Sequence, residues 1–225
     1  MNLKRERGLR RKGYKYVAGL DEAGRGPLAG PVVAAAVSII KNCKLKAKSV
    51  RSSSSRCDSK IADFKNLKDS KKLSPKKREE FYKILTRHPA IEWGIGRVSE
   101  KVIDKINIKN AAELAMEKAL LNLEKKIKRK ADFLIIDGNN IKNLQLTTYN
   151  LQLIVKGDEK VFSIAAASIL AKVYRDKIME RYAKKFPKYG FDRHKGYPTK
   201  LHLRMLKKYG PCKIHRKSFG PVKGL

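Results

Sequence analysis

The chain has 225 residues and carries 54 Lys and Arg against 21 Asp and Glu, a formal net charge of +33. That excess argues against an enzyme for neutral metabolites and favours a polyanionic partner, most simply nucleic acid, although a solvated basic surface typical of Lys-rich organisms would look the same. The length predicts one large domain, and a hydrophobic fraction of 42% excludes disorder throughout the chain.

The cysteines give no sign of a zinc knuckle or of a disulfide framework. Cys43, Cys57 and Cys212 are far apart, odd in number and form no CxxC pair. The basic N-terminus lacks the apolar core of a signal peptide, and no apolar run reaches the roughly 20 residues that cross a bilayer. We therefore expect a cytoplasmic protein without a membrane partner, and we expect it to be a monomer.

The first third of the chain predicts two strands between polar segments. Residues 1–14 have the composition of a flexible basic arm, and residues 15–21 and 31–40 are short apolar runs bounded by Gly and Pro. The segment 41–66 is rich in Lys and Ser and has no apolar periodicity. We expect it to be a flexible insertion.

The rest of the chain alternates helical and extended patterns. Ser74 is suited to cap a helix whose first residue is Pro75. The other expected elements are strands at 91–98, 132–136 and 150–155, helices over 99–129 and 163–186, and a short helix at 201–208. This order predicts an α/β fold, with a mixed sheet flanked by helices and a short helical C-terminal region.

Acidic residues stand at the ends of three expected strands: Asp21 with Glu22, Asp137 and Asp158. Sites in α/β sheets gather at strand ends, and carboxylates brought together there need cations to stay ionised. Hard oxygen ligands suit Mg²⁺ or Mn²⁺, and two such ions could assist hydrolysis of a phosphodiester. A single Asp-Gly at a strand end is commonly only a turn, so the interpretation depends on the combination.

A glycine-rich turn, Gly24-Arg25-Gly26, follows the first acidic pair. Glycines let a backbone approach a ligand closely, and successive N–H groups can form an anion-binding nest. The Arg25 guanidinium could contact a phosphate. Taken alone, the three residues could also be an ordinary tight turn between strands.

Six blocks together resemble the ribonuclease HII family, the type 2 ribonucleases H. They are GLDEAGRGPLAGPVV, LKDSKKLSPKKRE, LIIDGNN, VKGDEKVFSIAAASILAKVYRD, HKGYPTKLH and IHRKSF, and they extend from about residue 16 to residue 219. The resemblance implies a ribonuclease H-like domain over 15–225, with a substrate-contacting C-terminal region over 189–225.

The resemblance also implies a function. It implies a metal-dependent endonuclease that hydrolyses the RNA strand of RNA–DNA hybrids. It implies cutting 5′ of ribonucleotides embedded in duplex DNA, which leaves 3′-hydroxyl and 5′-phosphate ends and serves ribonucleotide excision repair. The implied cofactor is Mn²⁺ or Mg²⁺, with two ions per site, and the implied partners are RNA–DNA hybrids and DNA duplexes containing ribonucleotides.

Carried over by motif, the resemblance assigns individual residues. The catalytic metal ligands would be Asp21, Glu22, Asp137 and Asp158. The residues that read the ribose 2′-hydroxyl would be Gly24, Arg25, Gly26 and a tyrosine, which is Tyr197 or its neighbour in sequence Tyr189. The candidate phosphate contacts are Ser70, Lys71, Lys72, Lys172, Thr199 and Lys200.

Other polar residues have more ordinary interpretations. Asp176 lies inside an expected helix and is expected to pair with a nearby Arg or Lys, while His194, His202 and His215 are expected to contact substrate or form structural hydrogen bonds.

Two other functions stay open, a non-catalytic hybrid-binding protein and a different two-metal nuclease such as a junction resolvase. The complete acidic set argues against the first, and the Gly-Arg-Gly turn with its tyrosine argues against the second.

Overall fold

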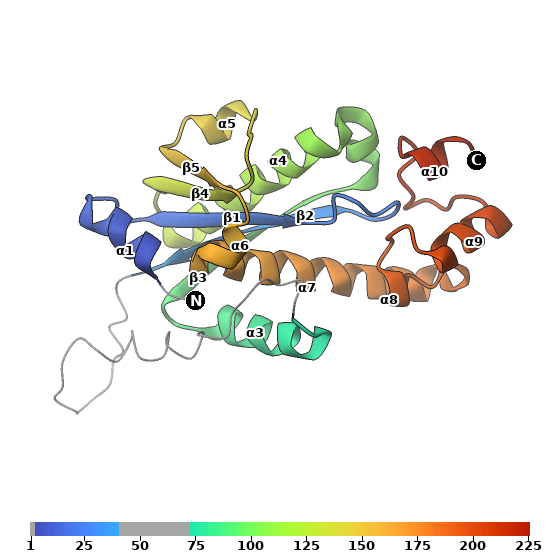
Figure 1. Cartoon of the computed structure of the whole chain (residues 1–225), viewed down its shortest axis with the longest axis horizontal. Coiled ribbons are helices and arrows are strands. Elements are labelled where there is room, and N and C mark those ends of the chain that lie inside the picture. The colour runs from blue at the N-terminus through green and yellow to red at the C-terminus, as the bar shows by residue number, and fades with distance from the viewer. Residues whose placement is uncertain (1–2, 41–72) are drawn as a thin grey trace.

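The computed structural model describes residues 3–40 and 73–225, and within these ranges the chain forms a five-stranded mixed sheet of order β3-β2-β1-β4-β5 (Figure 1). The strands are β1 (Val17–Ala23), β2 (Val32–Ile39), β3 (Ile91–Val98), β4 (Phe133–Asp137) and β5 (Leu151–Ile154). Strands β1, β2 and β3 pair antiparallel, whereas β4 and β5 continue the sheet parallel to β1. The predicted mixed sheet is confirmed; the segment 41–66 lies outside the described residues.

Helices cover both faces of this sheet. Helix α7 (Phe162–Lys185) and α3 (Pro75–Arg87) lie on one face, and α4 (Glu100–Ile127) lies on the other (Figure 1). Strand β2 shows the two-sided burial directly, because Val33, Ala35 and Val37 belong to the α7 core while alternate residues belong to the α4 core. All eight β2 residues are buried, which explains why all of them except Ser38 are apolar.

Glycine allows α4 to lie directly on β3. A Cβ at Gly94 would come 2.2 Å from the Ala119 carbonyl oxygen, and one at Gly96 would come 1.9 Å from the Ala115 carbonyl oxygen. Any side chain at these positions would push the helix away from the strand.

Helix starts follow the expected local chemistry. The Ser74 hydroxyl accepts a hydrogen bond from the Lys77 amide at 3.3 Å, so the predicted cap of α3 is confirmed. The single helix predicted over 99–129 is interrupted at Asn107, which has a φ of 65°. The Asn107 side chain then accepts from the Lys109 amide at 2.9 Å, so it recaps the helix where the backbone breaks.

The prediction of a flexible basic arm at the N-terminus is wrong for α1 (Lys4–Arg11). Glu6 is buried, and its carboxylate accepts from the Ser163 amide at 2.8 Å, at the start of α7. Leu9 packs into a small core with Val17 and Ile164. The Glu6 carboxylate thus accepts from an amide in the first turn of α7 that has no partner within the helix. Leu9 holds α1 against the sheet.

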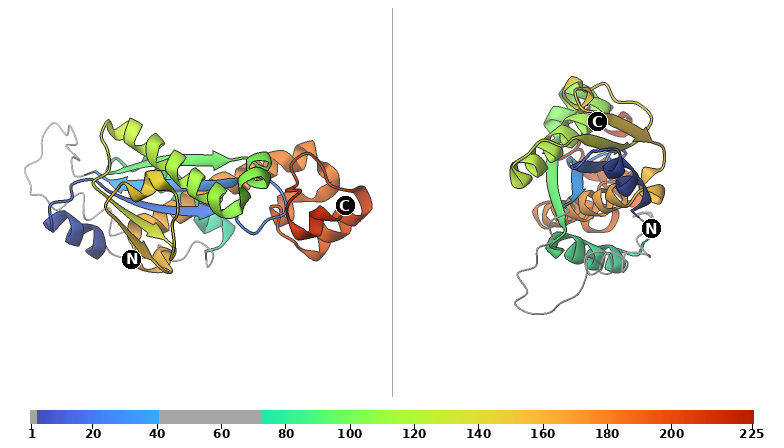
Figure 2. Two further views of the ribbon diagram at one scale, coloured as in Figure 1. Left: turned by 90° about the horizontal axis from the view of Figure 1, so that it is seen from above. Right: turned by 90° about the vertical axis from the view of Figure 1, so that its left-hand side faces the viewer.

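The C-terminal region extends past one end of the sheet, opposite the end that carries α1 (Figure 2). Its short elements are η2 (Pro187–Tyr189), α8 (Phe191–His194), α9 (Lys200–Tyr209) and α10 (Gly220–Lys223). A core of Ala29, Met179, Phe191 and neighbouring residues joins it to the loop between β1 and β2. Two further short helices, α5 (Leu144–Thr147) and α6 (Gly157–Lys160), flank β5.

The helices in the described part of the chain include none with the length and apolar character that a bilayer crossing requires.

Candidate active site

The parallel pairing of β1 with β4 brings two predicted acids together. Leu20 lies opposite Ile136 in the register, so Asp21 and Asp137 are the next residues on adjacent strands. Strand β1 continues through Glu22 to Ala23, because its other edge still pairs with β2. The predicted strand over 15–21 ended at Asp21, whereas β1 also includes Glu22 and Ala23.

Asp21 occupies a buried and negatively charged environment. Its side chain is 5% exposed, and it accepts hydrogen bonds from the Glu22 amide at 2.7 Å and from Ser168 of α7. Burial raises the pKa of Asp21 well above its ordinary value, and the charges of Glu22 and Asp137 raise it further. Asp21 thus lies within range of the charges of both Glu22 and Asp137.

The Glu22 carboxylate is also buried near another acid, but it has one positively charged neighbour, Arg25. Burial raises the pKa of Glu22 despite the opposing charge of Arg25, and Asp137 adds to the rise. An Arg25 guanidinium nitrogen lies 3.3 Å from the Glu22 carboxylate, but the Arg25 side chain is 58% exposed, so water weakens the pair. The described residues thus leave the site short of positive charge.

The turn that immediately precedes Asp158 is hydrogen-bonded to Asp137. The Gly157 amide donates to the Asp137 carboxylate at 2.7 Å, and a Cβ on Gly157 would lie 2.6 Å from the Ile164 Cδ1 atom, so a larger residue would have to displace that methyl group. Asp158 follows directly and is 5% exposed in the first turn of α6. Over residues 3–40 and 73–225, however, no three acidic, His or Cys side chains converge closely enough to hold an ion as they stand.

The donor chemistry nevertheless fits a divalent cation. The group consists of carboxylates alone, which are ligands for Mg²⁺ or Mn²⁺ rather than for softer metals. Two of its members, Asp21 and Glu22, have pKa values raised by burial and by acidic neighbours. A bound cation would relieve this unfavourable charge, and Asp21, Glu22, Asp137 and Asp158 are the residues that could hold it.

The Gly-Arg-Gly turn lies at the end of β1 beside the tyrosine that the sequence left open. The position of a Cβ on Gly26 would be 3.8 Å from the Tyr197 ring, and Tyr197 is 38% exposed. Tyr189 is buried instead, and its hydroxyl donates to the Gly210 carbonyl at 2.7 Å. Of the two candidates, Tyr197 therefore has the position and the accessibility for contact with a substrate.

Two of the other candidate contacts have structural partners. The Lys172 ammonium lies 2.7 Å from the Asp176 carboxylate, which also faces Arg78 at 3.5 Å, so the expected pairing of Asp176 is confirmed. The Thr199 hydroxyl accepts from the His202 amide at 3.2 Å and caps α9. Lys200 is exposed, and Ser70, Lys71 and Lys72 lie outside the described residues.

The three histidines form a buried cluster behind Tyr197. The His202 and His215 rings are joined by a 3.1 Å hydrogen bond between their Nε2 atoms, and the His194 ring stacks on His202 at 4.3 Å. Burial lowers the pKa of His202 and of His215 to about 4, so both rings are neutral at pH 7. The structure therefore supports the expected structural hydrogen bonds.

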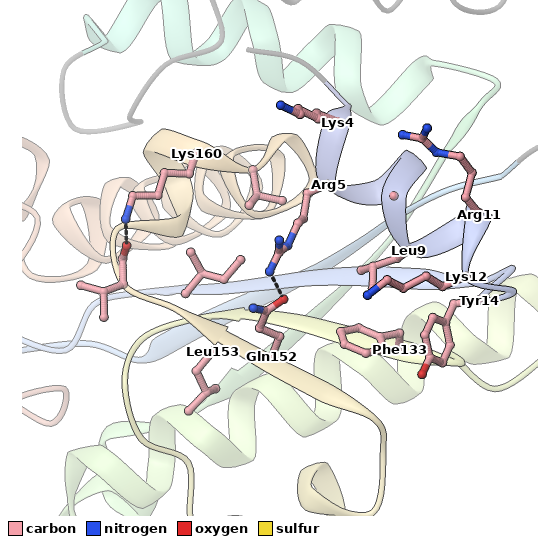
Figure 3. A pocket seen from close by; sticks show the side chains of 14 residues that line it. Lys4, Arg5, Leu9, Arg11, Lys12, Tyr14, Phe133, Gln152, Leu153 and Lys160 are labelled. Atoms are coloured by element: carbon pink, nitrogen blue, oxygen red, sulfur yellow. Dashed lines mark hydrogen bonds between the residues drawn. The ribbon is translucent and has the colours of Figure 1, made fainter.

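A concave surface of about 910 Å³ lies elsewhere, between α1 and the β4–β5 edge of the sheet (Figure 3). Its lining includes Arg5, Arg11, Lys12 and Lys160, and none of the four acids belongs to it. This pocket is therefore separate from the candidate active site.

Two buried arginines were not predicted as site residues: Arg216 donates to the carbonyl oxygens of Gly24 and Arg25 in the Gly-Arg-Gly turn, and Arg175 donates to the Pro31 carbonyl in the loop that follows the turn. The available signal was Arg175 itself, a charged residue on the face of α7 that otherwise carries Ala and Ile. Arg216 follows His215 in a loop, where nothing in the local pattern predicts burial.

Comparisons with known proteins agree with this architecture. A family model described as Ribonuclease HII matches residues 18–222. Ribonuclease HII of Bacillus licheniformis is 46% identical over 97% of this chain and 74% of its own length, and that of Caldicellulosiruptor bescii is 46% identical over 95% and 91%.

Solved structures show the same fold. The ribonuclease H2 of Pyrococcus horikoshii has a TM-score of 0.68 at 25% identity, covering 93% of this chain and 96% of its own. Ribonuclease HII in a complex with PCNA from Archaeoglobus fulgidus has a TM-score of 0.67 at 25% identity, covering 91% and 95%. The Bst ribonuclease HIII solved with Mn²⁺ has a TM-score of 0.66 at 18% identity, covering 92% and 68%, and shares the fold.

Proposed function

The chain belongs to the ribonuclease HII family and is a type 2 ribonuclease H, and from that premise we propose its substrate, its metal and its cut. We propose that it hydrolyses the RNA strand of RNA–DNA hybrids and cuts 5′ of ribonucleotides embedded in duplex DNA, leaving 3′-hydroxyl and 5′-phosphate ends. The observation that carries the proposal is the placement of Asp21 beside Asp137 on paired strands, where burial and neighbouring acids raise the Asp21 pKa.

In this proposal Asp21, Glu22, Asp137 and Asp158 hold two divalent cations, Mn²⁺ or Mg²⁺. Bound ions of this kind lower the pKa of a water molecule and neutralise charge on a leaving phosphate oxygen. The protein's own contribution is to fix the carboxylates before the metal arrives. The Gly157 amide orients Asp137, and the Glu22 amide with Ser168 orients Asp21.

Substrate selection falls to the turn next to these acids. The 2′-hydroxyl is the group that distinguishes a ribonucleotide from a deoxyribonucleotide. We assign its reading to the backbone of Gly24, Arg25 and Gly26, with Tyr197 placed against the same sugar. Exposure of Arg25 and Tyr197 on one side of the turn supports this assignment. Ser70, Lys71 and Thr199 remain proposed contacts to the substrate backbone.

Cleavage of a labelled DNA duplex with one internal ribonucleotide tests the proposal. We expect a single cut 5′ of the ribonucleotide with Mn²⁺ or Mg²⁺, and none in an all-DNA duplex of the same sequence. Asp137→Asn should abolish the cut while binding persists, and Glu80→Gln, at an exposed position on α3, should leave it unchanged. Failure of the folded wild-type protein to cut with either metal would overturn the proposal, and cutting of an all-DNA four-way junction would indicate a junction nuclease.

A further inference from the structure

Two arginines lie beneath the Gly-Arg-Gly turn with no exposure to solvent. Arg175 belongs to α7 and Arg216 to the segment between α9 and α10, and each side chain is 0% exposed. A buried charge is costly unless it is paired and hydrogen-bonded, so their retention under a substrate-facing turn requires a physical reason.

Arg216 hydrogen-bonds directly to the backbone of the turn. Its three guanidinium nitrogens donate to the carbonyl oxygens of Gly24 at 2.6 Å, of Arg25 at 3.0 Å and of Gly30 at 3.0 Å. Gly24 has a φ of +102°, and a Cβ there would lie 2.2 Å from the Arg175 Nε atom. The turn therefore has its carbonyls directed inward at a guanidinium, in a conformation that only glycine adopts without strain.

Arg175 connects the same loop to the tyrosine segment. It donates to the carbonyl oxygens of Pro31 at 3.0 Å and Ala29 at 3.1 Å, and its third bond, at 2.9 Å, goes to the Lys195 carbonyl two residues before Tyr197. The Tyr197 ring centroid lies 5.8 Å from this guanidinium. One side chain thus ties the β1–β2 loop to the segment that carries Tyr197.

All six of these hydrogen bonds end on neutral carbonyls, so no carboxylate among them neutralises the two charges. Burial and the charge of Arg175 lower the pKa of Arg216 to about 9, which leaves it protonated at neutral pH. Burial also lowers the pKa of Arg175. Acidic residues act on both charges, Glu100 and Asp104 on Arg216 and Asp176 on Arg175, but these interactions do not offset the effect of burial. The turn consequently lies over two cations that favour an anion at its outer face.

We propose that Arg175 and Arg216 are positioning residues for ribonucleotide recognition, which fix the Gly-Arg-Gly turn relative to Tyr197 and attract the phosphate of the nucleotide being read. The inference rests on the proposed function and deepens it. Neither arginine touches the substrate, since both act through the backbone that does. Their planar, five-donor geometry explains why lysine, with one point charge, is a poor substitute.

Arg216→Lys and Arg175→Lys test the inference because they keep the positive charge and remove the planar guanidinium group that donates to three carbonyls at once. For a duplex with a single ribonucleotide, we expect each variant to lower kcat/KM on the order of 100-fold, the loss expected when a reading group is misplaced by about 1 Å. For a continuous RNA–DNA hybrid we expect a loss on the order of 10-fold. A hybrid offers a 2′-hydroxyl at every step, so a displaced turn still finds one, whereas a single ribonucleotide offers one register.

The ratio of the two kcat/KM values within one protein sample is the decisive readout, because any unfolded fraction cancels from it. Arg181→Lys, exposed on the same helix as Arg175, is the matched control and should leave the ratio unchanged. Equal losses on both substrates, or no loss in either variant, would overturn the inference while leaving the proposed function intact. If wild-type protein fails to cut either substrate, the proposed function fails first.

Discussion

Asp21→Asn should make the metal-free protein more stable and inactive at once. The wild-type carboxylate is buried beside two other acids, and its pKa is raised well above its ordinary value near 3.8. Asn keeps an oxygen that can accept from the Glu22 amide, and it removes the charge. The change therefore relieves a conflict that the wild-type fold tolerates in order to bind a cation.

The expected gain follows from the cost of a poorly compensated buried polar group. Removing that cost raises the free energy of unfolding by about 1–3 kcal/mol. Loss of the hydrogen bond from Ser168 to the carboxylate subtracts from this gain. For a chain of this length the gain corresponds to a rise in Tm of roughly 2–12 °C. Added Mn²⁺ at 100 times its Kd should stabilise the wild-type protein by about 2.7 kcal/mol and the variant by much less.

The pH dependence has a definite sign. Because the folded-state pKa of Asp21 is raised, the folded protein retains a proton that the unfolded chain has released. Wild-type stability therefore falls as pH rises from the ordinary carboxyl pKa through the folded-state value. The stability advantage of Asp21→Asn should grow across the same interval and be small at lower pH.

Thermal melts in EDTA and in Mn²⁺, at several pH values, measure the gain in stability, the response to Mn²⁺ and the pH dependence. Glu80→Gln, which removes an exposed carboxylate on α3, is the control and should match the wild type throughout. A lower Tm for Asp21→Asn in EDTA, together with an undiminished response to Mn²⁺, would refute the reasoning.

Three further expectations concern other parts of the molecule. Glu6→Ala should destabilise the protein by about 1–2 kcal/mol, because it leaves a buried amide at the start of α7 without its acceptor; urea unfolding measures this, with exposed Glu80→Ala as control, and equal midpoints would contradict it. Tyr197→Phe should cleave a single-ribonucleotide duplex better than Tyr197→Ala, because the ring rather than the hydroxyl faces the turn; equal kcat/KM values would contradict a role for the ring. His202 and His215 have folded-state pKa values lowered to about 4, so they contribute stability above pH 6.5 that is lost as pH falls toward 4; urea midpoints that stay constant over this range would show that burial does not hold them neutral.

The sheet and its acids could be predicted because their signals are local. Each strand has its own apolar run and its own Gly or Pro boundary, and the acids stand at positions that strand order brings together. The sequence could also suggest that Asp21 and Asp137 meet, since both were expected at the ends of strands of one sheet, and the register of β1 with β4 places them next to each other. It could not give the pairing that extends β1 through Glu22, which depends on β2.

The remaining features depend on contacts between distant parts of the chain. A basic segment such as residues 4–11 has no strong pattern of its own, and its helix is fixed by the bond from Ser163 to Glu6, 157 residues apart. Arg175 and Arg216 likewise find their acceptors 144 or more residues away in the β1–β2 loop. Neither type of contact leaves a periodic trace in the sequence.

A crystal structure of the protein with bound Mn²⁺ would show directly whether the four acids hold the ions, because anomalous scattering locates the ions without reference to activity. We expect ions between Asp21 and Asp137, with Glu22 and Asp158 completing the set of protein ligands. Ions bound only at other sites, or an Asp158 side chain turned away from an occupied site, would contradict this expectation.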